Sequence, residues 1–295
     1  MTSYRVARSL AEVATAVASA NAALTIFAGG TDLMIRARAR VASGPVLDVS
    51  KVPELRRVAL VDGELVLGAG VTYTDCLTDP LIRDHAPILT QVAERFASPA
   101  IRNVATLGGN VANASPAGDG VAALWALDAR VEALTPAGRR VRPIEAVVVG
   151  PGRLGVPPGS VLTAFRVSAR GGGEGSAFYK LVNRAWPEHP MAISVASVAV
   201  RLRLDAAGRV ALARVVLGAV APTPVRAPAA EAALIAERPT PPRIEAAARA
   251  AVETAQPIGD LRASAGYRHE VLPALVATAI TAALRAAGAP AESDG

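Results

Sequence analysis

The sequence predicts an α+β protein of two domains, and three observations support this prediction. The chain has 295 residues, of which 52% are hydrophobic, so it is long enough for two domains and apolar enough to bury a core. Strand and helix patterns alternate up to residue 169, whereas after residue 176 three strands are followed only by helices. Between the two halves lies the Gly-rich segment Arg170–Gly175, which is typical of a linker.

The first half opens with short alternating elements. Ser9 and Glu12 have the spacing of a capping box, so we expect a helix from there to about Ala20. Asp62-Gly63 is a strong signal for a two-residue hairpin. The other helices are expected at 33–39, 74–78, 88–96 and 121–127, and strands at 24–28, 46–49, 57–61, 64–68, 130–134, 146–149 and 161–167.

The second half is predicted to be a smaller α+β domain. Strands are expected at 177–182, 192–204 and 210–217, and they would form a three-stranded antiparallel sheet. Helices at 228–236, 241–254 and 264–287 would stack on one face of this sheet. The tail, residues 288–295, is expected to be disordered.

Composition excludes several classes of protein. One cysteine and three histidines cannot form a disulfide framework or a His/Cys metal cluster. The net charge of +6 comes from 29 Arg and 2 Lys that are scattered along the chain, and aromatic residues make up only 3%. This pattern does not favour nucleic-acid binding. The longest strongly apolar run, Val271–Leu284, is too short to cross a bilayer, so we expect a protein of the cytoplasm.

Two segments could bind a ligand through their backbone. In Ile26–Leu33 a strand ends at Gly29-Gly30, and the alternative is a plain strand-to-helix turn capped by Asp32. Thr106–Asp119 is rich in small and polar residues, and is equally consistent with a binding loop and an ordered surface loop. Neither contains Lys or Arg, so together they suggest a pyrophosphate held by backbone N–H groups.

Standard catalytic motifs are not supported. The G-x-G-x-x-G match at Gly150–Gly155 is followed by Val156-Pro157-Pro158, so no helix can begin there and we interpret it as a turn. Cys76 is interpreted as a buried structural thiol, and we predict no catalytic residue and no metal ligand in this chain.

Taken in order, the motifs resemble those of a known family. The segments in question are Ala28–Leu33, Ser98–Asn110, Ala112–Asp119 with Ala126–Ala129, Gly218–Ala227 and Asp260–Arg268. They are similar to those of the FAD-binding subunit of molybdenum hydroxylases, the group of xanthine dehydrogenase, carbon monoxide dehydrogenase and 4-hydroxybenzoyl-CoA reductase.

The resemblance implies a fold and a set of cofactor-binding residues. Residues 1–169 would form a vanillyl-alcohol-oxidase-like (PCMH-type) FAD-binding domain with lobes of about 1–51 and 52–169. Residues 176–287 would resemble the C-terminal domain of the carbon monoxide dehydrogenase flavoprotein. The implied cofactor-binding residues are Ile26, Phe27, Ala28, Gly29, Gly30, Thr31, Asp32, Leu33, Phe96, Ile101, Thr106, Leu107, Gly108, Gly109, Asn110, Asp119, Leu162 and Lys180.

Two of these residues have an alternative interpretation. Asp119 is also placed to be the N-cap of the helix expected from Val121. Lys180 could equally belong to an exposed strand edge.

The resemblance also implies a function. The FAD of this subunit would accept electrons from a small [2Fe–2S] subunit and pass them to an external acceptor, and a large molybdopterin subunit would oxidise the substrate. The partners would assemble as a dimer of heterotrimers. A single cysteine agrees with iron–sulfur clusters on another chain, because those clusters are held by Cys thiolates. The alternatives are a stand-alone flavin oxidoreductase of the same fold and a non-catalytic assembly or binding protein.

Overall fold

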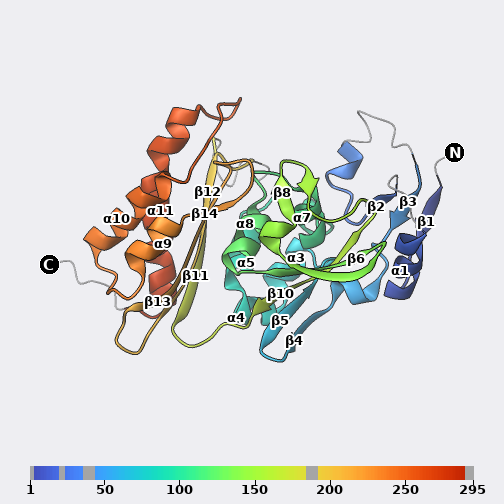
Figure 1. The fold of residues 1–295 in the computed structure, drawn as a ribbon, viewed down its shortest axis with the longest axis horizontal. Helices are drawn as coiled ribbons and strands as arrows, with labels where there is room; N and C mark the ends of the chain where they lie inside the picture. Colours follow the sequence, from blue (N-terminus) through green and yellow to red (C-terminus); the bar gives the residue numbers. More distant parts are fainter. Residues whose placement is uncertain (1–2, 20–23, 36–43, 184–191, 290–295) are drawn as a thin grey trace. The chain divides into compact units, whose positions relative to one another are not determined.

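The computed structural model describes residues 3–19, 24–35, 44–183 and 192–289. Packing divides the chain into two compact units, and each contains both strands and helices (Figure 1). The first unit comprises residues 1–85, 96–115 and 128–169, and the second comprises 86–95, 116–127 and 170–295. Within the described ranges, no helix combines the length and apolar character needed to span a membrane.

The first unit contains a small parallel sheet. Its strands are β1 (Tyr4–Val6), β3 (Val46–Asp48) and β2 (Thr25–Phe27), in the spatial order β1-β3-β2. Helix α1 (Leu10–Ala18) begins at Ser9, whose side chain accepts a hydrogen bond from the Glu12 backbone N–H as the capping pattern predicts. Apolar residues of α1, β3 and the loop after β3 form the core of this layer.

The first unit also contains a five-stranded antiparallel sheet. Its strands, in spatial order, are β4 (Val58–Val61), β5 (Glu64–Gly68), β10 (Val161–Ser168), β6 (Arg130–Thr135) and β7 (Gly138–Pro143). The predicted hairpin is confirmed, with Asp62 and Gly63 both at positive φ (51° and 76°). Strand β7 was not predicted, because all six of its residues are exposed and three are Arg.

Short helices connect these strands. They are η1 (Pro53–Arg56), α3 (Tyr73–Thr78), α4 (Pro80–His85), α6 (Pro99–Arg102), α7 (Leu107–Asn113) and η2 (Ile144–Ala146). The helix α7 lies inside Thr106–Asp119, which was predicted from the sequence to be a loop. The Gly150–Gly155 match belongs to the hairpin of β8 (Val148–Gly150) and β9 (Arg153–Leu154), so its interpretation as a turn is confirmed.

The second unit is built on a four-stranded antiparallel sheet, so the prediction of three strands was wrong. Its order is β11 (Glu174–Leu181), β12 (Ala196–Leu204), β13 (Val210–Gly218) and β14 (Val225–Arg226). The missed strand, β14, has only two residues, too few for an alternating pattern. The predicted helices are present as α9 (Pro228–Leu234), α10 (Pro241–Val252) and α11 (Ala265–Ala286).

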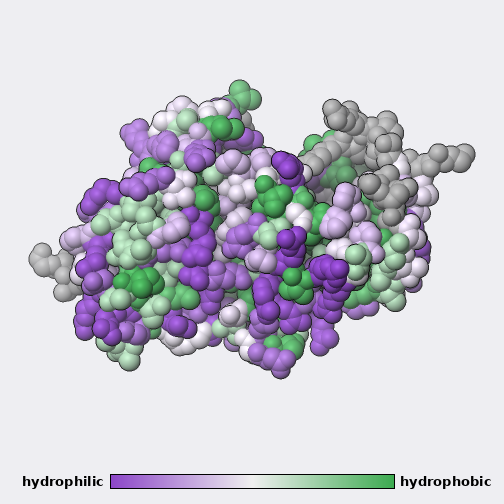
Figure 2. All heavy atoms as spheres, viewed as in Figure 1, coloured by the Kyte–Doolittle hydropathy of each residue, from purple (hydrophilic) through white to green (hydrophobic). Residues whose placement is uncertain are grey.

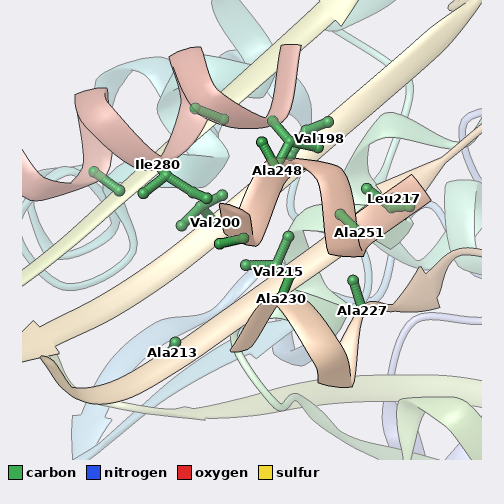
Figure 3. Packing of buried hydrophobic residues seen from close by; sticks show 14 of the residues in the cluster. Val198, Val200, Ala213, Val215, Leu217, Ala227, Ala230, Ala248, Ala251 and Ile280 are labelled. Carbon is green, nitrogen blue, oxygen red and sulfur yellow. The ribbon is translucent and has the colours of Figure 1, made fainter. Parts of the chain in front are cut away.

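Both faces of this sheet are covered, whereas the sequence predicted helices on one face. Val198, Val200 and Leu217 pack against α9, α10 and α11 in one apolar core (Figure 3). The opposite face of β12 and β13 contacts α8 (Asp119–Ala126), and α5 (Pro87–Glu94) contacts β11 (Figure 1). These two helices precede the sheet in the chain by many residues, so a linear pattern of strands and helices does not reveal them.

The backbone of the edge strand β11 forms hydrogen bonds with the side chain of Gln91 in α5. Gln91 Nε2 donates to the Ser176 carbonyl oxygen at 3.2 Å, and Gln91 Oε1 accepts from the Phe178 N–H at 2.7 Å. The amide of Gln91 therefore takes the place of a neighbouring strand at this edge.

A buried arginine ties the loop after α10 to the sheet. Arg268 is 3% exposed and donates to the carbonyl oxygens of Val195 and Ala219 and to Asp260 Oδ1. The pKa of Asp260 is lowered to about 2, mainly because the carboxylate accepts a hydrogen bond from the Arg262 backbone N–H. Hydrogen bonds from the Arg262 side chain and the Ala263 N–H, and the charge of Arg268, lower this pKa further.

Exposed hydrophobic side chains are dispersed. On the face seen in Figure 2 they form small separate groups among polar ones. The loop between α10 and α11 carries two of the most exposed, Ile258 and Leu261. Isolated exposed apolar residues of this kind are ordinary features of protein surfaces.

Candidate functional site

A cavity of the first unit has a volume of about 590 Å³. Its wall is formed by β2 with the turn after it, the segment from the end of β3 to η1, the segment from Ala69 to Tyr73, the chain from Phe96 to α7, and Leu154 with the start of β10. Fourteen of the eighteen predicted site residues line it: Ile26, Phe27, Ala28, Gly29, Gly30, Thr31, Asp32, Leu33, Phe96, Thr106, Gly108, Gly109, Asn110 and Leu162.

The two Gly-rich segments meet in this wall. A Cβ at Gly29 would lie 1.9 Å from the Val104 carbonyl oxygen, so only glycine allows the turn after β2 to approach the chain before α7 so closely. Gly30 has φ +71°, and a Cβ there would lie 2.6 Å from the Phe27 ring. The glycines are thus required by the wall itself, whatever ligand the cavity takes.

The first turn has unused donors. Among the described residues, no hydrogen bond occupies the backbone N–H groups of Gly29, Gly30, Thr31 or Asp32. The side chain of Asp32 accepts from Asn113 Nδ2 at 3.1 Å, which links the turn to α7. Successive free N–H groups at a concave turn are suited to an anion.

The second segment uses its backbone donors within the protein. The N–H groups of Leu107 and Gly108 donate to the carbonyl oxygens of Val71 and Ala69, and that of Gly109 donates to Thr106 Oγ1, the N-cap of α7. What this segment offers the cavity is the Asn110 side chain, whose buried Oδ1 has no hydrogen-bond partner in the described part of the chain. An unpaired buried amide oxygen is costly unless a ligand or water completes it.

Two stacked aromatic rings form another part of the wall. The centroids of Tyr73 and Phe96 are 3.7 Å apart with an interplanar angle of 10°. Both residues line the cavity, and the Tyr73 ring is fully buried whereas Phe96 is half-buried. Arg102 donates to the Phe96 and Ala97 carbonyl oxygens and so fixes the chain that carries the ring. Tyr73 was missed by sequence reasoning, because it reads as an ordinary apolar residue of a short helix.

Two cations that sequence reasoning missed also line the cavity. Lys51 follows β3, and Arg56 ends η1. The guanidinium of Arg56 pairs with Asp75 at 3.1 Å, and Asp75 also forms a capping box with Thr72 at the start of α3. Burial raises the pKa of Asp75, but the hydrogen bonds from Thr72 and Arg56 outweigh this and leave the pKa below its usual value.

Two predicted residues of the first unit lie outside the cavity wall. Leu107 is fully buried in the core, and Ile101 accepts hydrogen bonds at its carbonyl oxygen from the Val104 and Ala105 N–H groups. Both support the segment around Phe96 and Asn110 without lining the cavity.

Asp119 and Lys180 belong to the second unit and pair with each other. Lys180 Nζ lies 2.9 Å from Asp119 Oδ2, and Ser194 Oγ donates to Asp119 Oδ1 at 2.6 Å. The side chains of Lys180 and Asp119 are 7% and 6% exposed. The exposed-edge interpretation of Lys180 was therefore wrong, and so was the N-cap interpretation of Asp119, because Gly118 is the N-cap of α8. Their contact with a flavin stays a prediction.

Comparison with known proteins identifies the class. Residues 1–168 match the family described as the FAD binding domain in molybdopterin dehydrogenase, and residues 177–283 match the CO dehydrogenase flavoprotein C-terminal domain. The chain belongs to this family of flavoprotein subunits of molybdenum-containing dehydrogenases, and it is an oxidoreductase component with an FAD-binding domain. The predicted family, enzyme class and cofactor are thereby confirmed.

Individual relatives cover nearly the whole chain. It is 32% identical over 293 residues to the putative xanthine dehydrogenase FAD-binding subunit of Escherichia coli K12, with 97% of each chain covered. It is 28% identical over 283 residues to the carbon monoxide dehydrogenase medium chain of Hydrogenophaga pseudoflava, covering 95% of this chain and 96% of the relative.

Solved structures agree with these relatives. A carbon monoxide dehydrogenase structure from Hydrogenophaga pseudoflava superposes with a TM-score of 0.90 at 29% identity, covering 96% of this chain and 97% of that one. Quinoline 2-oxidoreductase from Pseudomonas putida 86 superposes with a TM-score of 0.88 at 27% identity, with 98% of each chain covered.

Proposed function

We propose that this chain is the electron-transferring flavoprotein subunit of a three-subunit molybdenum hydroxylase. Its FAD would accept electrons from a [2Fe–2S] subunit and pass them to an external acceptor, while a large molybdopterin subunit oxidises the organic substrate. The observation that carries the proposal is the cavity wall of the first unit, in which a Gly-Gly turn presents free N–H groups beside an unpaired amide and an aromatic ring.

The residues present fit FAD. The N–H groups of Gly29–Asp32 would hold the pyrophosphate, since an anion can accept from several of them at once. Asn110 Oδ1 would gain a donor from the cofactor, and the Phe96 ring would lie against one of its planar groups. The bound flavin supplies the redox chemistry, and the chain's part is to position it and exclude water.

The proposed domain organisation follows the two sheets of the first unit. We assign the PCMH-type domain to residues 1–169, with lobes of about 1–51 and 52–169, and the flavoprotein C-terminal domain to residues 176–287. The parallel sheet lies wholly before residue 51 and the five-stranded sheet wholly after it, which supports this division.

We further propose that the complex is cytoplasmic and assembles as a dimer of heterotrimers. The relatives named as medium chains support the presence of a large and a small partner. The mass of the complex purified through this chain tests the stoichiometry, and a complex with one copy of each subunit would contradict it.

A purification with and without partners tests the function. The chain purified with its partners should carry FAD, with an absorption band near about 450 nm. When no chemical reductant such as dithionite is added, loss of this band through reduction of the FAD should require both the substrate and the [2Fe–2S] subunit. The chain purified alone should bind added FAD with the same band. A folded chain that stays colourless after FAD addition would contradict the proposal.

A further inference from the structure

The FAD pyrophosphate carries negative charge. Without a nearby cationic side chain, only uncharged backbone N–H groups would stabilise this charge. Neither Gly-rich segment contains Lys or Arg. Charge-assisted hydrogen bonds to phosphate are stronger than neutral ones, so a cation near the turn would add to binding. The candidates are the cationic residues that line the cavity, Lys51 and Arg56.

The topology places Lys51 beside the Gly-Gly turn. Strands β2 and β3 are parallel neighbours with Phe27 opposite Asp48, and the Val49 N–H donates to the Phe27 carbonyl oxygen at 2.8 Å. Lys51 therefore lies three residues beyond the paired position on β3, as Gly30 does on β2. The carboxyl ends of neighbouring parallel strands lie at the same edge of a sheet, so both residues belong to one end of this layer.

Lys51 is also the cation that remains available. Arg56 is already paired with Asp75, and Lys180, the other lysine of the chain, is buried against Asp119. Lys51 is exposed, and no carboxylate in the described ranges lies within ion-pair distance of it. Its charge helps to lower the pKa of Asp48, but the Asp48 carboxylate is bonded by Tyr4 and Ser50.

We propose that Lys51 binds the dinucleotide phosphates of the cofactor, reaching the turn of Gly29–Asp32 from the neighbouring strand end. This inference rests on the proposed function. A lysine is suited to the role because its ammonium is a point charge on a long, flexible stem, and no side chain of the described residues forms an ion pair with it.

FAD binding to the full chain, freed of its cofactor, tests the inference. Lys51→Met removes the charge and keeps a side chain of similar length, so the dissociation constant for FAD should rise about tenfold. The loss should be smaller at high salt, because screening weakens the wild-type contact. Lys51→Arg should retain affinity within about threefold, since it keeps the charge.

Arg57→Met is the matched control. Replacing Arg57 by Met changes the net charge by the same amount as Lys51→Met, but Arg57 is exposed and does not line the cavity. Its dissociation constant for FAD should equal that of the wild type. Equal FAD affinity of Lys51→Met and wild type, or an equal loss in both Met variants, would overturn the inference. Failure of the wild type itself to bind FAD would instead overturn the proposed function.

Discussion

Gly29 and Gly109 both line the cavity, but a side chain would meet different surroundings at each. At Gly29 a Cβ would overlap the backbone of Val104, which cannot move without displacing the chain before α7. At Gly109 a Cβ would approach only Thr106 Oγ1, at 2.9 Å. Gly29 is therefore needed for the fold of the wall, whereas a side chain at Gly109 would meet only one side-chain atom of the described residues within 4 Å.

Alanine substitutions should separate these roles. Gly29→Ala should lower the free energy of unfolding by about 2 kcal/mol or more because of the backbone overlap. Gly109→Ala should change stability less and still reduce FAD retention. Thermal unfolding and the flavin content of the purified chain measure the two effects, and a Gly109→Ala chain with full flavin content would contradict the assignment of this position.

Removing one partner of the buried pair of Lys180 and Asp119 should destabilise the protein strongly. Lys180→Met leaves the Asp119 carboxylate buried with Ser194 as its one side-chain partner among the described residues, so we expect a loss of about 3–5 kcal/mol in the free energy of unfolding. Lys180→Met with Asp119→Leu should recover part of it, because no unpaired charge remains. Urea unfolding measures both, and a single variant as stable as wild type would contradict the pairing.

Asp260 predicts a pH dependence of stability. Its folded pKa of about 2 lies below the ordinary value, so its contribution is present above about pH 4 and is lost as the pH falls through 2. Asp260→Asn should therefore be less stable than wild type at pH 5, and the difference should shrink at pH 2.5. Urea unfolding at both pH values measures this difference. A gap that stays constant would show that the ionised carboxylate is not what holds Arg268.

At the scale of elements, Gln91 joins α5 to the edge of β11. Gln91→Ala would leave the Phe178 N–H and the Ser176 carbonyl oxygen without this partner, which should cost about 1–3 kcal/mol. Hydrogen exchange at the Phe178 amide should become faster. Glu94→Ala is the control, because Glu94 is exposed on the same helix. Unchanged exchange in Gln91→Ala would mean that the edge is protected by other contacts.

Elements with a local signal could be predicted from the sequence. The Asp62-Gly63 hairpin and the capped helix α11 depend on residues that are adjacent in the chain: Ser264 caps α11 by accepting from the Tyr267 N–H. The helix α7 could not be predicted, because its glycines read as loop residues. Gly108 is needed because a Cβ would lie 2.6 Å from the Ala69 carbonyl oxygen, which is a tertiary contact.

The candidate site divides in the same way. The Gly-Gly turn belongs to a contiguous segment that resembles the family, so this resemblance identified its residues, and they line the cavity. Tyr73, Lys51 and Arg56 reach the cavity from other elements. The stacking on Phe96 places Tyr73 there, the register of β2 with β3 places Lys51, and the ion pair with Asp75 holds Arg56. Contacts between residues far apart in the sequence cannot be predicted from the spacing of residues along the chain.

At the scale of the whole chain, the two units are interleaved in sequence. Helix α5 and helix α8 come from the first half but pack in the second unit, and all eight residues of α8 are buried. A fragment of residues 170–295 therefore lacks the cover for one face of its sheet. We expect it to show no cooperative unfolding transition of its own.

Cleavage of the intact folded chain provides the control for that fragment. Gly171 and Gly172 are exposed in the turn before β11, so a protease site placed there should be cut without loss of the transition. Circular dichroism during urea unfolding compares the two samples. A stable, cooperative fragment of residues 170–295 would contradict the importance of α5 and α8.

The interleaving also has a consequence for synthesis on the ribosome. Helix α8 emerges early, but the strands β12 and β13 that it contacts are made only after the whole five-stranded sheet. Because nascent chains grow by about 5–20 residues per second, this apolar helix remains uncovered for seconds. During that interval the newly made chain would be a substrate for chaperones, and the segment Phe96–Ser115 would lie between two helices, α5 and α8, that are not yet packed on their sheet.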